Sequence, residues 1–187
     1  MTYPAYVEKE LLYPGQLSSG QKGSAVKKLQ EWLSLNNFSC EPDGIFGKAT
    51  FSCLQRFQQK KGLPADQSLT PDCWQQLITP MQRALTHSTA TDNLSAAVLA
   101  VAQKHLAEHP VEVGGDNKGP WVRLYMKGNE STAWFWCAGF VSFLLQQACS
   151  QQKQKMPIPG SFSCDLLASQ GKAAGLFVPE KQAATIN

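Results

Sequence analysis

The apolar residues of the N-terminal part recur every three or four positions, which is the spacing of one face of a helix. The segments with this spacing cover about 24–36, 48–61 and 71–77. Ser24 fits an N-cap of the first helix, and Gly62 fits the left-handed cap that ends the second. Thr70 followed by Pro71 fits the N-cap and first position of the third. The pattern predicts a small three-helix module.

The C-terminal part also has helical spacing. Apolar positions predict helices from Asn93 to a point before Pro110, from Cys137 onward, and over about 161–174. In the second of these, an apolar stripe is expected to face a core; it consists of Phe140, Val141, Leu144, Leu145 and Ala148. The sequence therefore predicts a mainly α fold.

Cys137 is expected in the first turn of its helix. Unpaired backbone N–H groups and the positive end of the helix dipole favour a thiolate there, and a thiolate is the nucleophilic form of cysteine. Ala138 and Gly139 leave little bulk beside the sulfur, which would let a substrate carbonyl approach. The alternative is a buried structural cysteine, since cysteine beside tryptophan is common in protein cores.

The N-terminal part resembles the type 1 peptidoglycan-binding domain from about Gln16 to Ile78. The matching residues are Gly23 to Gln30, Asp43 to Gly47, Thr50, Arg56 to Gln58, Gly62 to Pro64, Trp74 and Leu77. The resemblance implies a three-helix module over 16–78 that binds peptidoglycan, with Asp43 and Phe46 as candidate contacts. Two alternatives stay open: Phe46 as a core anchor, and a module that serves only as a spacer.

Residues 79–92 are predicted to be a linker, because they have no clear period and many small polar side chains. Residues 93–187 resemble the CHAP-type branch of the NlpC/P60 cysteine peptidases and amidases, papain-like enzymes that cut the peptide part of peptidoglycan. The resemblance is carried by 116–125 and by Trp136 to Val141. It implies that Cys137 is the nucleophile and that this region is the helical N-terminal part of a papain-like α+β domain.

Four further residues are candidates for substrate binding in this resemblance. They are Asp116, Asn117, Trp134 and Trp136. For Asp116 and Asn117 the alternative is an ordinary surface turn. No cofactor is expected, and no metal site either, because the six cysteines form no CxxC pair.

A base for Cys137 is missing from the expected place. Papain-like folds supply it as a later histidine on a strand, whereas His87, His105 and His109 all precede Cys137. Three explanations stay open: a chain that continues beyond Asn187, an inactive relative, or a base recruited from His105 or His109. Both of these histidines are expected to be structural.

The composition of the chain limits the classes of binding partner that we expect. The net charge of +3 does not call for nucleic acid, and no apolar run reaches the length of a membrane span. Charged residues near the N-terminus argue against a Sec signal, so synthesis in the cytoplasm and action at the bacterial wall are expected, through phage lysis or specialised secretion. A complementing chain and a cognate inhibitor or immunity protein are further candidate partners.

Two functions follow as hypotheses. The first is a cell-wall-degrading cysteine endopeptidase or amidase that uses the Cys137 thiolate on an amide bond of murein. The second is a non-enzymatic wall-binding protein whose C-terminal half is a degenerate scaffold.

Overall fold

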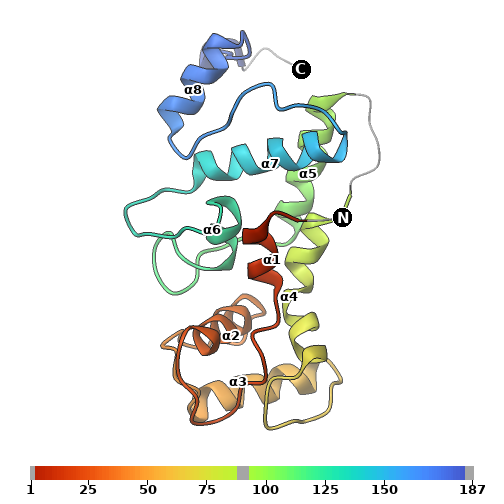
Figure 1. The fold of residues 1–187 in the computed structure, drawn as a ribbon, viewed down its shortest axis with the longest axis vertical. Helices are drawn as coiled ribbons and strands as arrows, with labels where there is room; N and C mark the ends of the chain where they lie inside the picture. The colour runs from red at the N-terminus through yellow and green to blue at the C-terminus, as the bar shows by residue number, and fades with distance from the viewer. Residues whose placement is uncertain (1–2, 88–92, 184–187) are drawn as a thin grey trace. The chain divides into compact units, whose positions relative to one another are not determined.

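The fold is built from helices joined by loops (Figure 1). The computed structural model describes residues 3–87 and 93–183. Its helices are α1 (Ala5–Leu11), α2 (Ser24–Leu35), α3 (Lys48–Lys60), α4 (Pro71–Leu85), α5 (Leu94–Ala107), α6 (Pro120–Tyr125), α7 (Cys137–Gln151), α8 (Cys164–Ala173) and α9 (Glu180–Ala183). Within the described ranges, extended pairing is limited to isolated bridges. The prediction of a mainly α fold is confirmed.

The described residues divide into two compact units. Unit 1 comprises those of Met1–Thr86 and Gln103–Trp134, and unit 2 comprises those of His87–Ala102 and Phe135–Asn187. The division falls inside α5. Residues 103–134, which the sequence analysis grouped with Cys137, therefore pack with the N-terminal helices.

The core of unit 1 forms between α2, α3 and α4. The indole rings of Trp32 and Trp74 are fully buried and meet edge to face, with centroids 6.3 Å apart. Phe38, just after α2, meets Phe57 of α3 in the same way at 5.5 Å. Aromatic pairs of this kind add about 1 kcal/mol each to the free energy of unfolding, beyond the effect of burying their surface. The predicted three-helix module is present.

The helix ends follow the predicted signals with one exception. Thr70 Oγ1 accepts a hydrogen bond from the Cys73 amide at 3.3 Å, and Pro71 is the first residue of α4. Gly62 has a φ of +66°, as a left-handed cap requires. Ser24, by contrast, is the first residue of α2 and not its cap, a position that Gly23 takes.

The third helix is longer than predicted. It continues through Pro80 to Leu85, so residues 79–85 of the predicted linker are helical. A proline inside a helix costs about 3 kcal/mol. Burial of Met81 and Leu85, which are 0% and 4% exposed, offsets that cost, since each such side chain contributes about 1.5–3 kcal/mol. Residues 88–92 of the predicted linker lie outside the described residues.

The segment before the module contains α1, which packs against α6. The indole Nε1 of Trp74 donates to the carbonyl of Leu11 at 2.8 Å, and the Tyr13 hydroxyl donates to the carbonyl of Leu69 at 2.8 Å. These bonds fix the N-terminal segment to the three-helix core.

A buried ion network joins three parts of unit 1. The guanidinium of Arg123, on α6, donates to Glu10 of α1 at 2.8 Å and to Glu31 of α2 at 2.7 Å. It also donates to Glu130 at 2.8 Å, in the loop after α6. Glu10 and Glu31 are 6% and 1% exposed, so solvent screens these contacts weakly. Lys27 lies 3.8 Å from Glu31 and 3.9 Å from Glu130.

The carboxylates of this network differ in acidity. Burial raises the pKa of Glu31 above its usual value, although Arg123 acts in the opposite direction. Burial also acts to raise the pKa of Glu130, but the Gly119 amide, Arg123 and Lys27 together outweigh it, and the pKa of Glu130 lies below its usual value. Glu31 therefore depends more than Glu130 does on its cationic partner to stay ionised.

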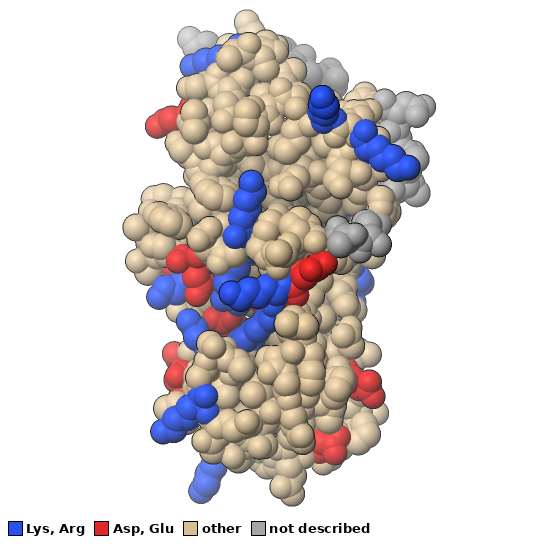
Figure 2. Space-filling view, in the orientation of Figure 1, with Lys and Arg blue, Asp and Glu red and all other residues tan. Residues whose placement is uncertain are grey.

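Unit 2 has a smaller core. Ala97 and Val101 of α5 pack against Leu144 and Ala148 of α7. Figure 2 shows that charged side chains are sparse over the face of α7 and α8 that it presents. Val141, predicted to face the core, is 50% exposed. The side of α7 that carries Leu144 and Ala148 packs on α5, and Phe143 is also buried. No helix of the described residues has both the length and the apolar character needed to cross a membrane.

We expect Arg123→Met to lower the free energy of unfolding of unit 1 by about 3–5 kcal/mol, because it leaves buried carboxylates without their cation. Urea unfolding of the full chain measures this. Arg83→Met is the matched control: Arg83 pairs with Glu108 at 2.6 Å, but its side chain is 59% exposed, so the loss should stay below about 1 kcal/mol. Equal losses in the two variants would contradict the proposed importance of the network.

Candidate functional site

The loop between α2 and α3 is the first candidate site. Its turn begins at Asp43, whose Oδ1 accepts from the Ile45 amide at 2.7 Å, and Gly44 follows with a φ of +74°. A Cβ at Gly44 would stand 3.2 Å from the Gly23 carbonyl oxygen, so the position suits glycine for space as well as for φ. The Gly23 amide donates to the carbonyl of Gly44 at 2.9 Å, which ties the turn to the start of α2.

The buried side chain of Gln30 holds this turn in place through hydrogen bonds. Its side chain is 1% exposed, and its Nε2 donates to Asp43 Oδ1 at 2.8 Å, to the Ile45 carbonyl at 3.1 Å and to Thr50 Oγ1 at 2.9 Å. Its Oε1 accepts from the Gly44 amide at 2.8 Å. Gln30 was not among the predicted site residues. One feature of the sequence could have pointed to Gln30: it is a polar residue directly after Leu29, in a turn of helix α2 that faces the core.

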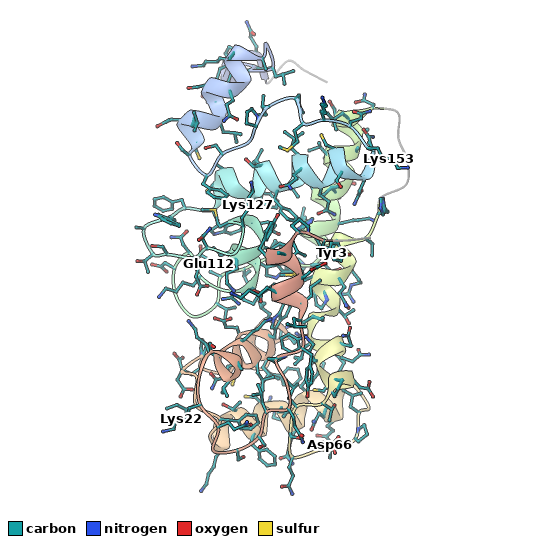
Figure 3. All side chains as sticks on the ribbon, in the orientation of Figure 1. Tyr3, Lys22, Asp66, Glu112, Lys127 and Lys153 are labelled. Carbon is teal, nitrogen blue, oxygen red and sulfur yellow. The ribbon has the colours of Figure 1, made fainter. Side chains whose placement is uncertain are left out.

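The two predicted contacts in this loop have different surroundings. Phe46 is 1% exposed and lies in the core, so it is the core anchor of the alternative interpretation and not a surface contact. Asp43 is exposed, and its bonds from Ile45 and Gln30 lower the pKa of its carboxyl. Ile45, which the sequence analysis did not propose, is 45% exposed at the tip. Lys22 pairs with Ile45 through an isolated bridge and points outward in Figure 3.

A comparison with protein-family models identifies this region. Residues 22–77 match the model of the family described as "Putative peptidoglycan binding domain". The chain contains an N-terminal peptidoglycan-binding domain. The predicted resemblance over 16–78 is thereby supported, and the Asp43–Gly47 turn lies within the matched range of the binding domain. The match ends at residue 77, so the resemblance proposed for 93–187 stays a prediction.

Cys137 is the second candidate site. It is the first residue of α7, as predicted, and its side chain is exposed. No side chain caps this end of the helix. Ala138 and Gly139 are buried beneath it, and Trp136 packs edge to face on Phe140 with centroids 6.1 Å apart. The thiol is therefore accessible at a helix N-terminus, which the alternative of a sealed core cysteine does not fit.

Cys137 lines a cavity of about 390 Å³ in unit 2. The other lining residues are Ala138, Val141, Ile158, Cys164, Leu167, Ala168, Gly171, Leu176, Phe177 and Val178. Cys164, the first residue of α8, is also exposed. The lining is apolar apart from the two thiols, and no residue of this set carries an imidazole or a carboxylate.

The other predicted site residues divide between the units. Asp116, Asn117 and Trp134 belong to unit 1, whereas Trp136 belongs to unit 2 with Cys137. Asp116 is exposed, and Trp134 is 51% exposed. Asn117 is 6% exposed with a φ of +53°, and its amide donates to the Thr132 carbonyl at 3.4 Å. The surroundings of Asn117 fit a structural turn residue.

His105 is structural, as expected. It is fully buried, and its Nδ1 lies 3.0 Å from the hydroxyl of Tyr125. Burial raises the pKa of Tyr125 well above its usual range, so this hydroxyl stays protonated, and the tautomer of His105 decides which of the two groups donates. His109 is exposed, with a φ of +50° in the turn after α5.

We expect Gln30→Leu to cost about 2–3 kcal/mol, since a leucine of similar size leaves the buried groups around it without partners. The amide of Gly44 should then exchange hydrogen for deuterium much faster than in the parent chain. Gln59→Leu, at an exposed position of α3, is the control and should change stability by less than about 0.5 kcal/mol. Unchanged protection of Gly44 would show that the turn does not depend on Gln30.

Proposed function

We propose that this chain acts on the bacterial cell wall: the N-terminal domain binds peptidoglycan, and the Cys137 thiolate cuts an amide bond in the peptide part of murein. The observation that supports the second step is an exposed thiol at the N-terminus of a 15-residue helix, beside a cavity, in a chain with a peptidoglycan-binding domain. Phage lysis and specialised secretion are the two proposed routes to the wall.

The proposed reaction is nucleophilic acyl transfer. The sulfur would attack the amide carbonyl carbon, and the oxygen that becomes negative would accept from the backbone N–H of Cys137, because the first N–H groups of a helix have no partner within it. The C–N bond would then break, the amine would leave with a proton, and water would hydrolyse the thioester. Ala138 and Gly139 leave space for this approach.

A proton donor for the leaving amine is the demanding part of this proposal. General acid–base help is worth roughly 10²–10⁴ in rate. His105 is buried on Tyr125 and poorly suited, whereas His109 is exposed and is the better candidate. We therefore expect weak activity from this chain unless His109 or another chain supplies the base.

A second candidate function is wall binding without catalysis. The observation that favours it is the lining of the Cys137 cavity, which contains neither an imidazole nor a carboxylate. In that case the α7–α8 region would be a scaffold, and Cys137 an ordinary accessible thiol.

We expect the full chain to sediment with purified sacculi, and Ile45→Asn to weaken this binding about fivefold. Ile45 is a half-exposed apolar side chain at the tip of the Asp43–Gly47 turn, and the loss of about 1 kcal/mol of apolar burial corresponds to that factor. Leu12→Asn is the control, because Leu12 is another exposed apolar residue of unit 1, at 66%. Equal weakening by both variants would argue against the turn as the contact.

We expect iodoacetamide to modify Cys137 at least tenfold faster than Cys164 at neutral pH. Cys164 is a matched control because it is also exposed and also begins a helix. Release of soluble peptides from sacculi should be slow, should fall to background in Cys137→Ala, and should persist in Cys164→Ala. Equal alkylation rates together with no release would favour the non-enzymatic function.

The same assay identifies the base. If His109 supplies the proton, His109→Ala should reduce peptide release by about 10² or more, whereas alkylation of Cys137 should still proceed. Release unaffected by this change would exclude His109.

A further inference from the structure

Two buried cysteines face one another in the peptidoglycan-binding domain. Cys40 lies between α2 and α3, Cys53 lies in α3, and each is 6% exposed. The Sγ of Cys53 donates to the carbonyl of Ser39, the residue next to Cys40, at 3.3 Å. The Sγ of Cys40 lies 3.9 Å from Thr50 Oγ1, and Thr50 precedes Cys53 by three positions on the same face of α3. Burial is the main cause that raises the pKa of the Cys40 thiol, and the neighbouring Cys53 thiol acts in the same direction.

The backbone at both positions is held in place. Ser34 Oγ donates to the Cys40 carbonyl at 2.7 Å and accepts from the Cys40 amide at 3.1 Å, which fixes this part of the loop to α2. Cys53 is in the middle of a 13-residue helix. The two thiols thus have little freedom to move apart in the folded domain.

We propose that Cys40 and Cys53 form a disulfide when the chain folds or resides in an oxidising compartment, and that this bond staples the Asp43–Gly47 turn to α3. A low-molecular-weight disulfide such as oxidised glutathione is a sufficient oxidant. The thiolate of one cysteine displaces one glutathione thiol from it, and the second cysteine displaces the other. One S–S bond forms, one breaks, and both protons leave with the products.

The disulfide can persist where peptidoglycan lies, because that compartment is oxidising. Disulfides persist outside the reducing cytosol, including at the cell surface and in the periplasm, where peptidoglycan lies. The inference uses the location of peptidoglycan but not the proposed role of Cys137, which lies in the other unit. A chain without hydrolytic activity would leave it intact.

The bond is expected to form during folding more readily than in the folded domain. Burial raises the pKa of the Cys40 thiol to about 12, and a thiol that is rarely ionised exchanges slowly. Once formed, the bond would close a loop of 14 residues, from Cys40 to Cys53, that contains the whole turn. Closing such a loop in the unfolded chain is the source of its stabilising effect.

The test is refolding of the full chain from urea in a buffer of reduced and oxidised glutathione, followed by trypsin without reduction. Trypsin cuts after Lys48, between the two cysteines, and yields peptides 29–48 and 49–56. The proposal predicts that these two peptides remain joined, two hydrogen atoms lighter than their sum. The oxidised chain should unfold about 10 °C higher than the reduced chain.

The Cys53→Ala variant should yield no joined peptides. Its oxidised and reduced forms should unfold at the same temperature. Cys73→Ala, at a third buried cysteine of the domain, should keep both the joined peptides and the difference in unfolding temperature. Each variant is compared only with itself, so a general loss of stability does not affect the result. Recovery of Cys40 and Cys53 as thiols, or as separate glutathione adducts, would overturn the proposal. A joined pair that unfolds no higher than the reduced chain would overturn the stapling role.

Discussion

The guanidinium of Arg123 is the interaction on which unit 1 depends. It holds carboxylates from α1, α2 and the loop after α6, and Glu10 is 113 positions away in the sequence. Such a buried cluster contributes little net free energy of folding when it is complete, because the desolvation of the charges offsets their attraction. Removal of the cation is strongly destabilising, because the carboxylates then stay buried without a partner. The network thus specifies which segments pack together. It explains why residues 103–134 belong with the peptidoglycan-binding domain and not with Cys137.

Local features of the fold could be read from the sequence. The apolar spacing located α2 and α3, the Thr70-Pro71 pair located the start of α4, and Cys137 was placed at the first position of α7. These signals act within a few residues. Contacts across long separations leave no such period, so neither Arg123 nor Gln30 was identified. Val141 shows a related limit: a stripe of apolar residues does not reveal how much of it a small core can cover.

The binding domain and the Cys137 region use their polar groups differently. In the Asp43–Gly47 turn, Gln30 satisfies four groups from the interior, so an exposed tip is presented on a rigid base. The cavity beside Cys137 is apolar and open, with thiols as its reactive groups. The first arrangement is suited to recognition by shape. In the proposed reaction, the second would bring an amide close to sulfur and would leave proton transfer to groups outside its lining.

The position of Glu31 has a consequence for how this domain could be exchanged between proteins. Glu31 lies inside the matched segment 22–77, whereas its partner Arg123 lies outside it. A recombination event that moved only the matched segment would separate an acid from its cation and uncover the surface that α6 occupies. A transferable segment that keeps this ion pair would therefore have to be larger than the family match. It would include α1 and the segment around Arg123, which hold the other members of the network.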